Sequence, residues 1–321
     1  MREVNFINVS GGKDSTAVLL LALEQQPPNM RFIFADTGHE HPEVYTYLDY
    51  LDRELGIHIE RVRADFTERL AKRRKFVEEN WPEEQAKAAL EVMHPSGSAF
   101  LDLAVWKGRF PSPMARFCTE HLKREPLDIL TNAALNDADR VVSWLGIRHD
   151  ESRSRANALE WEREFGPEHA PQEGLWKYRP ILIWTALEVF EFIRSKGIKP
   201  NPLYKKGMGR VGCMPCINAR KGEVAAIAQR FPDEIDRVED WERKVGAASK
   251  RGTSTMFSVH KIGLDRTTDE VTVESHGIRK VAEWSKTTRG GRQFGFEFGD
   301  GGGCSSVYGL CEVDDRPEGN D

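Results

Sequence analysis

Apolar and polar positions alternate in blocks along the first 65 residues. Apolar runs rich in β-branched and aromatic residues occur at 4–9, 30–36 and 57–64. Between them, apolar residues recur at helical spacing in STAVLLLALEQ (15–25) and PEVYTYLDYLDREL (42–55). This strand–helix–strand–helix–strand order predicts a parallel sheet with helices on its faces. Ligands of such sheets bind at the carboxyl ends of the strands.

The alternation continues less regularly to about residue 200. A basic helix is predicted at 67–80 and another helix at 126–135. A fourth strand is predicted at 140–148, followed by a short buried strand and an amphipathic helix within 178–197. The expected fold class is therefore α/β, with a doubly wound, parallel sheet.

The pattern changes after residue 200. A Gly/Pro/Cys loop at 201–216 leads into a helical stretch, GEVAAIAQRF, and roughly the last 70 residues have few apolar runs. That tail cannot bury much on its own, so it is expected to fold back over the first part. We therefore predict two units: a nucleotide-binding domain at 1–200 and a C-terminal, cysteine-bearing extension at 201–321.

Composition narrows the class of protein. The 321 residues are 39% hydrophobic and 30% charged, which is ordinary for a soluble globular protein. The net charge of -5 gives no whole-protein case for nucleic-acid binding, so any basic surface must be local. No apolar run approaches the roughly 18 residues of a membrane span, and the N-terminus does not resemble a signal peptide. A cytoplasmic protein without membrane partners is expected.

The first candidate site is the loop SGGKDS between the first strand and the first helix. Backbone N–H groups at a helix N-terminus favour an anion, and hydroxyls and a lysine add donors. The glycines would remove side chains that keep a phosphate away. A tight turn without a ligand is the structural alternative. The residues of this predicted phosphate cradle are Ser10, Gly11, Gly12, Lys13, Asp14 and Ser15.

This loop resembles the SGGxDS signature of the PP-loop ATP pyrophosphatase superfamily, whose fold is that of the adenine nucleotide α-hydrolases. The resemblance implies ATP cleavage between the α and β phosphates, with Mg²⁺ neutralising the phosphates. A substrate oxygen attacks the α-phosphate, pyrophosphate leaves, and the adenylated substrate becomes open to a nucleophile. Lys13 and Asp14 are then expected to act in catalysis.

A second motif, FADTGHEHPE, follows the second strand and places Asp36, Thr37 and Gly38 at its carboxyl end. By itself it is equally consistent with a capped turn before a helix. Together with FCTEHLKREP, GIRHDES and RVGCMPC, it resembles the phosphoadenosine-phosphosulfate (PAPS) reductase branch of the superfamily. These matches run over roughly residues 4 to 220. The resemblance implies that Asp36, Thr37 and Gly38 contact the nucleotide.

Within that branch, Lys13 favours a chain that still cleaves ATP, because the loop of sulfonucleotide reductases typically lacks this lysine. The pairing of RFCTEHLK with RVGCMPC resembles most the PP-loop sulfurtransferases of DNA phosphorothioation. The leading hypothesis is an ATP pyrophosphatase that supports sulfur transfer. The alternatives are a PAPS or adenylyl-sulfate reductase and a nucleotide-binding regulatory or defence subunit without turnover.

The five cysteines are expected to be metal ligands or reactive thiols. Cys213 and Cys216 form a C-x-x-C in a Gly/Pro loop, which suits zinc, an iron–sulfur cluster or a redox pair. Cys118 lies in the motif that resembles the cysteine element of the branch. Cluster-bearing members take ligands from these two places, so the resemblance implies a [4Fe–4S] cluster, with zinc as the alternative.

The remaining two cysteines lie near the C-terminus. Cys304 follows three glycines and is expected to be the fourth ligand, with Cys311 as the alternative. Cys311 is expected to be a free, nucleophilic thiol, by its resemblance in position to the C-terminal cysteine of sulfonucleotide reductases.

Charged residues supply the last candidates. Arg148, in GIRHDES, is a candidate partner for the α-phosphate in the transition state, with a surface salt-bridge network as the alternative. Arg116 and Lys123 flank Cys118 and are candidates to hold an anionic substrate. Histidines such as His39 are interpreted as caps or surface groups rather than ligands.

The sequence leaves the partners beyond ATP open. The sulfur donor is unknown, the acceptor is a nucleic acid or a nucleotide, and a homodimer is the oligomer considered. If the acceptor is a nucleic acid, the basic segments AKRRK (71–75) and RKVAEWSKTTRGGRQ (279–293) are the places to look, although solvated helix faces and loops also have this composition.

Overall fold

The fold was obtained as a computed structural model that describes residues 1–151, 155–257 and 271–288. Six strands form one sheet in the order β3-β2-β1-β4-β6-β5. Neighbouring strands are parallel except for β5, which pairs antiparallel with β6. The predicted α/β class and doubly wound sheet are confirmed, with an antiparallel edge added. The strands are β1 (Glu3–Asn8), β2 (Met30–Asp36), β3 (Ile59–Arg63), β4 (Arg140–Trp144), β5 (Trp161–Phe165) and β6 (Gly174–Tyr178).

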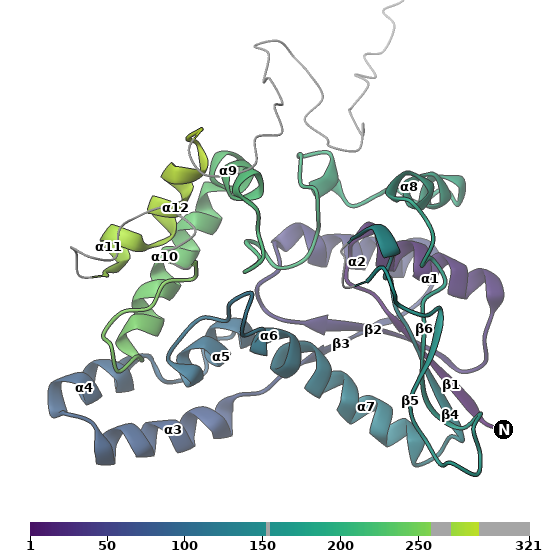
Figure 1. The fold of residues 1–321 in the computed structure, drawn as a ribbon, viewed down its shortest axis with the longest axis horizontal. Coiled ribbons are helices and arrows are strands. Elements are labelled where there is room, and N and C mark those ends of the chain that lie inside the picture. The colour runs from purple at the N-terminus through teal and green to yellow at the C-terminus, as the bar shows by residue number, and fades with distance from the viewer. Residues whose placement is uncertain (152–154, 258–270, 289–321) are drawn as a thin grey trace, which may run out of the picture.

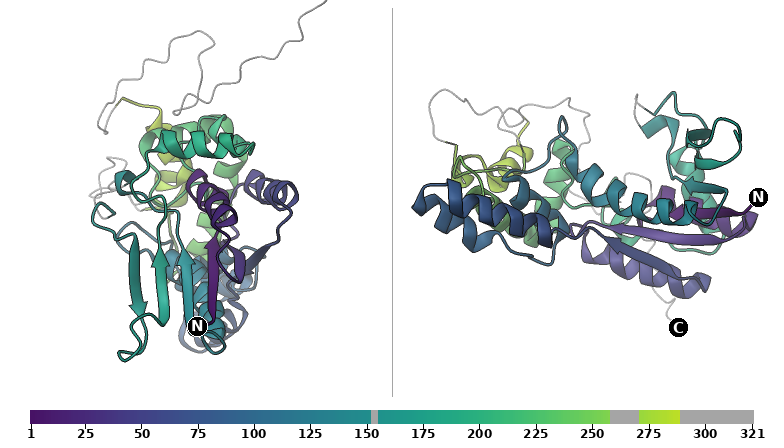
Figure 2. Two further views of the ribbon diagram at one scale, coloured as in Figure 1. Left: turned by 90° about the vertical axis from the view of Figure 1, so that its right-hand side faces the viewer. Right: turned by 90° about the horizontal axis from the view of Figure 1, so that it is seen from below.

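Helices cover both faces of this sheet. In the right-hand view of Figure 2, the sheet lies between α7 and α2. The helices of the sheet region are α1 (Lys13–Gln25), α2 (Pro42–Leu55), α7 (Glu125–Leu135) and α8 (Ala186–Ser195). The second group of helices gathers at the end away from the N-terminus (Figure 1): α3 (Thr67–Asn80), α4 (Glu83–Val92), α5 (Ala99–Lys107), α10 (Pro232–Ala247), α11 (Val273–His276) and α12 (Ile278–Ser285).

Period-two alternation within the strands explains the two-sided core. Successive residues of a strand point to opposite faces. Phe6 packs in the small cluster beneath α7, whereas the next residue, Ile7, packs in the large cluster. Val141 and Val142 divide between the two clusters in the same way. A strand with both faces buried carries apolar residues on both sides, as Phe6 and Ile7 show in VNFINV.

The sequence predicts one strand that does not form and misses two strands that do. The short buried strand expected around RPILIW is a turn after β6, because Pro180 cannot donate a ladder hydrogen bond and Ile183 is 82% exposed. The strands β5 and β6 were missed. Segment WEREF mixes charged and aromatic residues because its strand lies at an exposed edge, which removes the hydrophobic pattern.

The chain after residue 200 joins the large core cluster. Short segments η3 (Pro202–Tyr204) and α9 (Lys221–Arg230) precede α10. Leu203, Ile227 and Val238 are fully buried in the same cluster as Ile7. The boundary at residue 200 stays a prediction. In the part of the chain that the structure describes, no helix is long and apolar enough to cross a bilayer.

Candidate functional site

The predicted phosphate cradle lies at the topological switch point of the sheet, where the strand order reverses. From β1, the chain proceeds to β2 on one side, and β4 lies on the other side. In open α/β sheets, ligands bind at this switch point, outside the carboxyl ends of the strands. The loop after β1 ends at Gly12, the N-cap of α1, whose N–H groups therefore point into the switch point.

Several backbone donors in the cradle have no acceptor. Gly12 provides no side-chain cap to α1. Within the described residues, no acceptor is recorded for the N–H groups of Gly11, Gly12, Asp14 and Ser15, and three of these four residues are buried. Buried N–H groups are nearly always paired, and a helix N-terminus favours an anion. The cradle therefore fits a phosphate group.

The two glycines act differently from what the sequence suggested. Gly11 has φ +72°, and a Cβ there would lie 2.9 Å from a Val44 methyl group, while a Cβ at Gly12 would lie 3.5 Å from the Tyr204 hydroxyl. The space that these glycines leave is thus filled by protein. Their role is to let the loop pack tightly, and the phosphate would meet backbone N–H groups.

Residues far along the chain hold the loop in place. The Tyr204 hydroxyl accepts from the Lys13 N–H at 2.8 Å, and the Asn201 side chain donates to the Gly11 carbonyl at 3.0 Å. The Ser15 hydroxyl accepts from the Ser10 N–H at 3.0 Å. Ser10 and Ser15 therefore brace the loop.

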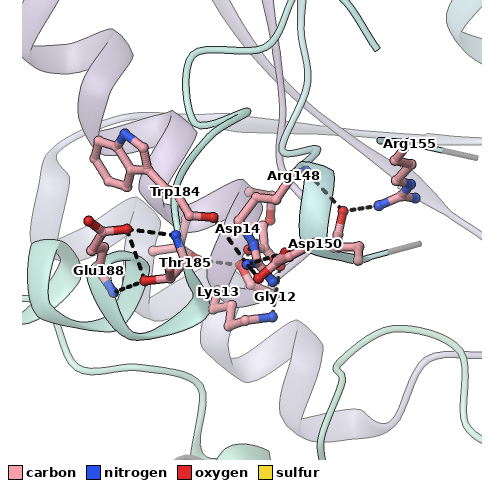
Figure 3. A network of polar contacts seen from close by, with 12 residues as sticks. Gly12, Lys13, Asp14, Arg148, Asp150, Arg155, Trp184, Thr185 and Glu188 are labelled. Carbon is pink, nitrogen blue, oxygen red and sulfur yellow. Dashed lines mark hydrogen bonds and ion pairs between the residues drawn. The ribbon is translucent and has the colours of Figure 1, made fainter. Parts of the chain in front are cut away.

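An ion network surrounds the start of α1 (Figure 3). The Asp14 carboxylate accepts from the Lys13 ammonium at 2.9 Å and from the Arg148 guanidinium at 2.6 Å. Arg148, which is only 4% exposed, also donates to Asp150 at 2.6 Å. Burial alone would lower the pKa of Arg148, but the carboxylates of Asp14 and Asp150 outweigh it and raise that pKa. Arg148 is thus a buried, fixed cation beside the cradle.

The loop that carries Arg148 fits against α1. A Cβ at Gly146 would lie 2.8 Å from the Ser15 N atom, so only glycine allows this approach. The close packing brings GIRHDES and SGGKDS together.

Asp36 lies at the carboxyl end of β2 and is 4% exposed. Its carboxylate accepts from the Tyr45 hydroxyl at 2.7 Å and from Arg63 Nε at 3.0 Å. The hydrogen bond to Asp36 is the main cause that raises the pKa of Arg63. The Gly38 N–H donates to the same carboxylate at 2.9 Å, as in a capped turn. The carboxylate of Asp36 therefore accepts hydrogen bonds from the protein itself and holds the loop after β2 in shape.

The loop after β2 also contacts the C-x-x-C. The Thr37 hydroxyl lies 3.5 Å from Cys213 Sγ, and Glu40 and Cys213 form an antiparallel β-bridge. Burial and then Glu40 raise the pKa of Cys213 to about 12, so this thiol is protonated at neutral pH. Metal binding there would displace a proton.

Three of the predicted ligands, Cys118, Cys213 and Cys216, influence one another electrostatically. Burial, followed by Cys216, raises the pKa of Cys118. Lys123, from a π-helical turn at Glu120–Arg124, has its pKa raised chiefly by Cys213. Among the described residues, no three His, Cys, Asp or Glu side chains form a group placed to hold a metal ion. The other predicted ligand, Cys304, and the predicted nucleophile, Cys311, lie outside the described residues.

His39 is a structural residue that the sequence did not reveal. It was expected at the surface or as a cap, but it is fully buried and stacks on Phe100, with ring centroids 4.3 Å apart. Because the Pro215 carbonyl can only accept, His39 Nε2 donates to it at 2.9 Å. Nδ1 then accepts from Arg237 at 3.3 Å. His39 thus ties the loop after β2 to the C-x-x-C loop.

Replacing His39 with phenylalanine should reduce the acid sensitivity of the fold. Burial lowers the pKa of His39 to about 3 from an ordinary 6.5. As the pH falls from about 6.5 towards 3, the unfolded chain gains a proton that the folded chain does not, so stability is lost. His39→Phe should lower the melting temperature near pH 7.5 by leaving the Pro215 carbonyl unpaired. The melting temperature should also fall less between about pH 7.5 and 5 than in the wild type.

The matched control for this prediction is His58→Phe, at an exposed position. It should keep the wild-type acid dependence. An equal loss of melting temperature on acidification in His39→Phe and the wild type would contradict the role given to His39.

The geometry defines an α/β protein with a candidate anion cradle at the switch point of its sheet and a cysteine loop in contact with the end of the neighbouring strand β2. A family model described as "Phosphoadenosine phosphosulfate reductase domain" matches residues 5–219. The chain therefore belongs to the PAPS reductase family, which confirms the predicted resemblance.

Several relatives support this assignment. An uncharacterized 37.8 kDa protein of Escherichia phage 186 is 47% identical, over 96% of this chain and 97% of its own length. An uncharacterized protein of Methanocaldococcus jannaschii is 28% identical over 72% of this chain, which spans 40% of that protein. The phosphoadenosine 5'-phosphosulfate reductase of Cronobacter sakazakii is 26% identical over 61% of this chain and 64% of its own length.

Among solved structures, the PAPS reductase from Candida auris overlaps 65% of this chain and 80% of its own, with 15% identity and a TM-score of 0.40. The FMN adenylyltransferase from Candida glabrata overlaps 65% and 54%, with 11% identity and a TM-score of 0.38.

Proposed function

We propose that this protein is an ATP pyrophosphatase of the PAPS reductase family that adenylates an acceptor and supports the transfer of sulfur to it. The proposal follows the DNA-phosphorothioation type of PP-loop sulfurtransferase. An acceptor oxygen attacks the α-phosphorus of ATP, the bond to the bridging oxygen of the β-phosphate breaks, and pyrophosphate leaves. A sulfur nucleophile then displaces AMP, which departs with the acceptor oxygen.

One observation carries this proposal: the loop at the carboxyl end of β2, where a nucleotide would bind, contacts the loop that holds Cys213. Thr37 follows Asp36 at the carboxyl end of β2, and its hydroxyl lies 3.5 Å from Cys213 Sγ. The N–H of Met214 donates to the His39 carbonyl at 2.9 Å, which continues the pairing of the two loops. An acceptor activated at the cradle would therefore lie beside the thiols without moving to another part of the protein.

The residues of the cradle have distinct roles in this proposal. The N–H groups of Gly11, Gly12, Asp14 and Ser15 bind phosphate oxygens. Lys13 and Arg148 supply the positive charge that the departing pyrophosphate and the α-phosphate require. Asp14 holds both cations at the cradle until phosphates compete for them.

The kinds of donor present suit the proposed cofactors, although the described part of the chain brings no three of them together at one point. Asp14 and Asp150 are carboxylates of the kind that, together with phosphates, bind Mg²⁺. Cys118, Cys213 and Cys216, with Lys123 to balance negative charge, suit a [4Fe–4S] cluster completed by Cys304, and zinc is the alternative. When bound, such a cluster would supply a redox-active, thiolate-held centre beside the acceptor.

Pyrophosphate release tests the proposal. Anaerobically purified protein with ATP and Mg²⁺ should release pyrophosphate in the presence of an acceptor, and AMP when a sulfur nucleophile such as sulfide is also added. A PAPS reductase, favoured by the 26% identical Cronobacter relative, would instead release sulfite from phosphoadenosine phosphosulfate and no pyrophosphate from ATP. A regulatory subunit would show neither reaction.

A further inference from the structure

The segment from Lys107 to Arg124 concentrates positive charge in a chain whose net charge is -5. It has a single acidic residue, Glu120, against five basic ones: Lys107, Arg109, Arg116, Lys123 and Arg124. In the described ranges, none of these five forms an ion pair with a carboxylate. By contrast, Lys72 and Lys75 of the basic run AKRRK lie near Glu68 and Glu79 in i,i+4 pairs.

The basic run of α3 is therefore the weaker candidate for an anion-binding surface, because its lysines already lie near carboxylates. Besides these lysine pairs, Arg74 donates to the Leu90 carbonyl at 2.6 Å and to the Met93 carbonyl at 3.1 Å, which holds α4 against α3. Arg74 thus stabilises the helical part of the fold, and each of the two lysines has a carboxylate within 3.9 Å. The remaining cation of the run, Arg73, lies over the Phe76 and Trp81 rings.

Aromatic rings hold the first cations of the segment instead of carboxylates. The Lys107 ammonium lies 4.0 Å from the centroid of the Trp106 ring, and the Arg109 guanidinium lies 5.6 Å from that of Phe117. Arg69 lies 5.1 Å from the Trp106 centroid and also forms an ion pair with Glu125 at 2.9 Å. The cation–π contacts of Lys107 and Arg109 fix these two cations in position without a direct ion pair, so their charge stays available to an anion.

The charges of this group act on one another. Burial lowers the pKa of Lys107, the neighbouring Arg69 and Arg109 lower it further, and Glu120 and Glu125 oppose this in part. Such crowding of like charges costs stability, and a bound polyanion would relieve it. We call Arg69, Trp106, Lys107, Arg109 and Phe117 the cation platform.

The cation platform adjoins the cysteine site. Phe117, whose ring makes cation–π contacts with both Lys107 and Arg109, directly precedes Cys118. Further along the same segment, Lys123 and Arg124 lie in the π-helical turn Glu120–Arg124. Basic residues thus recur along the chain from the end of α5 to both sides of Cys118, and such a series suits a chain of phosphates better than a single phosphate.

We propose that the cation platform binds the phosphodiester backbone of a nucleic acid strand and leads it to the cysteine site. The role of that strand as the acceptor rests on the proposed function, whereas the binding itself does not. Contacts are to the backbone, so binding should depend strongly on salt and weakly on base sequence.

Fluorescence anisotropy with labelled single-stranded DNA and RNA of about 20 nucleotides tests this inference. The double variant Lys107→Glu/Arg109→Glu should bind at least about tenfold more weakly than the wild type. Its slope of log affinity against log salt should be smaller by about 1.4, as expected for two lost contacts to a single strand. The matched control, Lys72→Glu/Lys75→Glu, changes the net charge equally and should bind like the wild type.

The outcomes separate the binding surface from general charge and from misfolding. The milder Lys107→Gln/Arg109→Gln variant, with an unchanged melting temperature, should show an intermediate loss. Equal losses in the two glutamate variants, wild-type binding by Lys107→Glu/Arg109→Glu, or binding of anionic vesicles but not of oligonucleotides would each overturn the inference. Oligonucleotide binding without pyrophosphate release would refute the proposed function alone. Pyrophosphate release without oligonucleotide binding would refute this inference alone.

Discussion

Replacing Lys13 with methionine should lower the rate of pyrophosphate release from ATP by roughly 10²–10³-fold, the usual effect of removing one charged donor from developing negative charge. The Lys13 side chain is only 6% exposed and lies 2.9 Å from Asp14, directly at the cradle. Methionine keeps the length of the chain without the charge. The measurement is a coupled pyrophosphate assay at saturating ATP, with the melting temperature followed in parallel.

Two further variants sharpen this prediction. Arg148→Lys keeps the positive charge but loses the planar guanidinium that joins Asp14 to Asp150, so it should lose part of the rate. Lys72→Met, which removes a surface lysine that is 83% exposed, should leave the rate unchanged. A Lys13→Met protein that is folded and releases pyrophosphate at the wild-type rate would show that this lysine takes no part in ATP cleavage.

The sequence predicts the fold best where the apolar residues recur with the spacing of the helix or strand that forms. The helix expected at 42–55 matches α2, and the strand expected at 30–36 matches β2, because each has a clear apolar face or core run between Pro and Gly signals. The edge strand β5 escaped because its exposure removes that pattern. The apolar run ILIW misled because turns can also bury isolated side chains, as at Ile181.

The candidate site was predictable as motifs but not as contacts. SGGKDS and GIRHDES were each recognisable, and the structure joins them through Asp14 and Arg148, which are 134 positions apart. Partners of this kind have no local signal. The same holds for Tyr204, which holds the Lys13 N–H from 191 positions away, and for the buried His39. Short motifs thus identify the chemistry, whereas long-range packing decides how each residue is held.

Replacing Cys213 with alanine should remove most of the metal from anaerobically purified protein. The wild type is expected to contain about four iron and four acid-labile sulfide atoms per chain, with a broad absorbance near ~400 nm. Cys213 is the cysteine that contacts Thr37, in the loop after β2. Loss of one thiolate of a four-cysteine set usually prevents stable assembly of a cluster. Iron in the variant should fall below about one atom per chain.

The cysteines themselves supply the controls for this experiment. Cys304→Ala should lose iron as Cys213→Ala does, whereas Cys311→Ala should keep it, since Cys311 is assigned as the free thiol. Zinc without iron in the wild type would contradict the cluster and favour the tetrahedral alternative. Full iron content in Cys213→Ala would instead refute the ligand assignment. If iron is lost while pyrophosphate release persists, ATP cleavage and sulfur transfer use separate residues on the two sides of the Thr37–Cys213 contact.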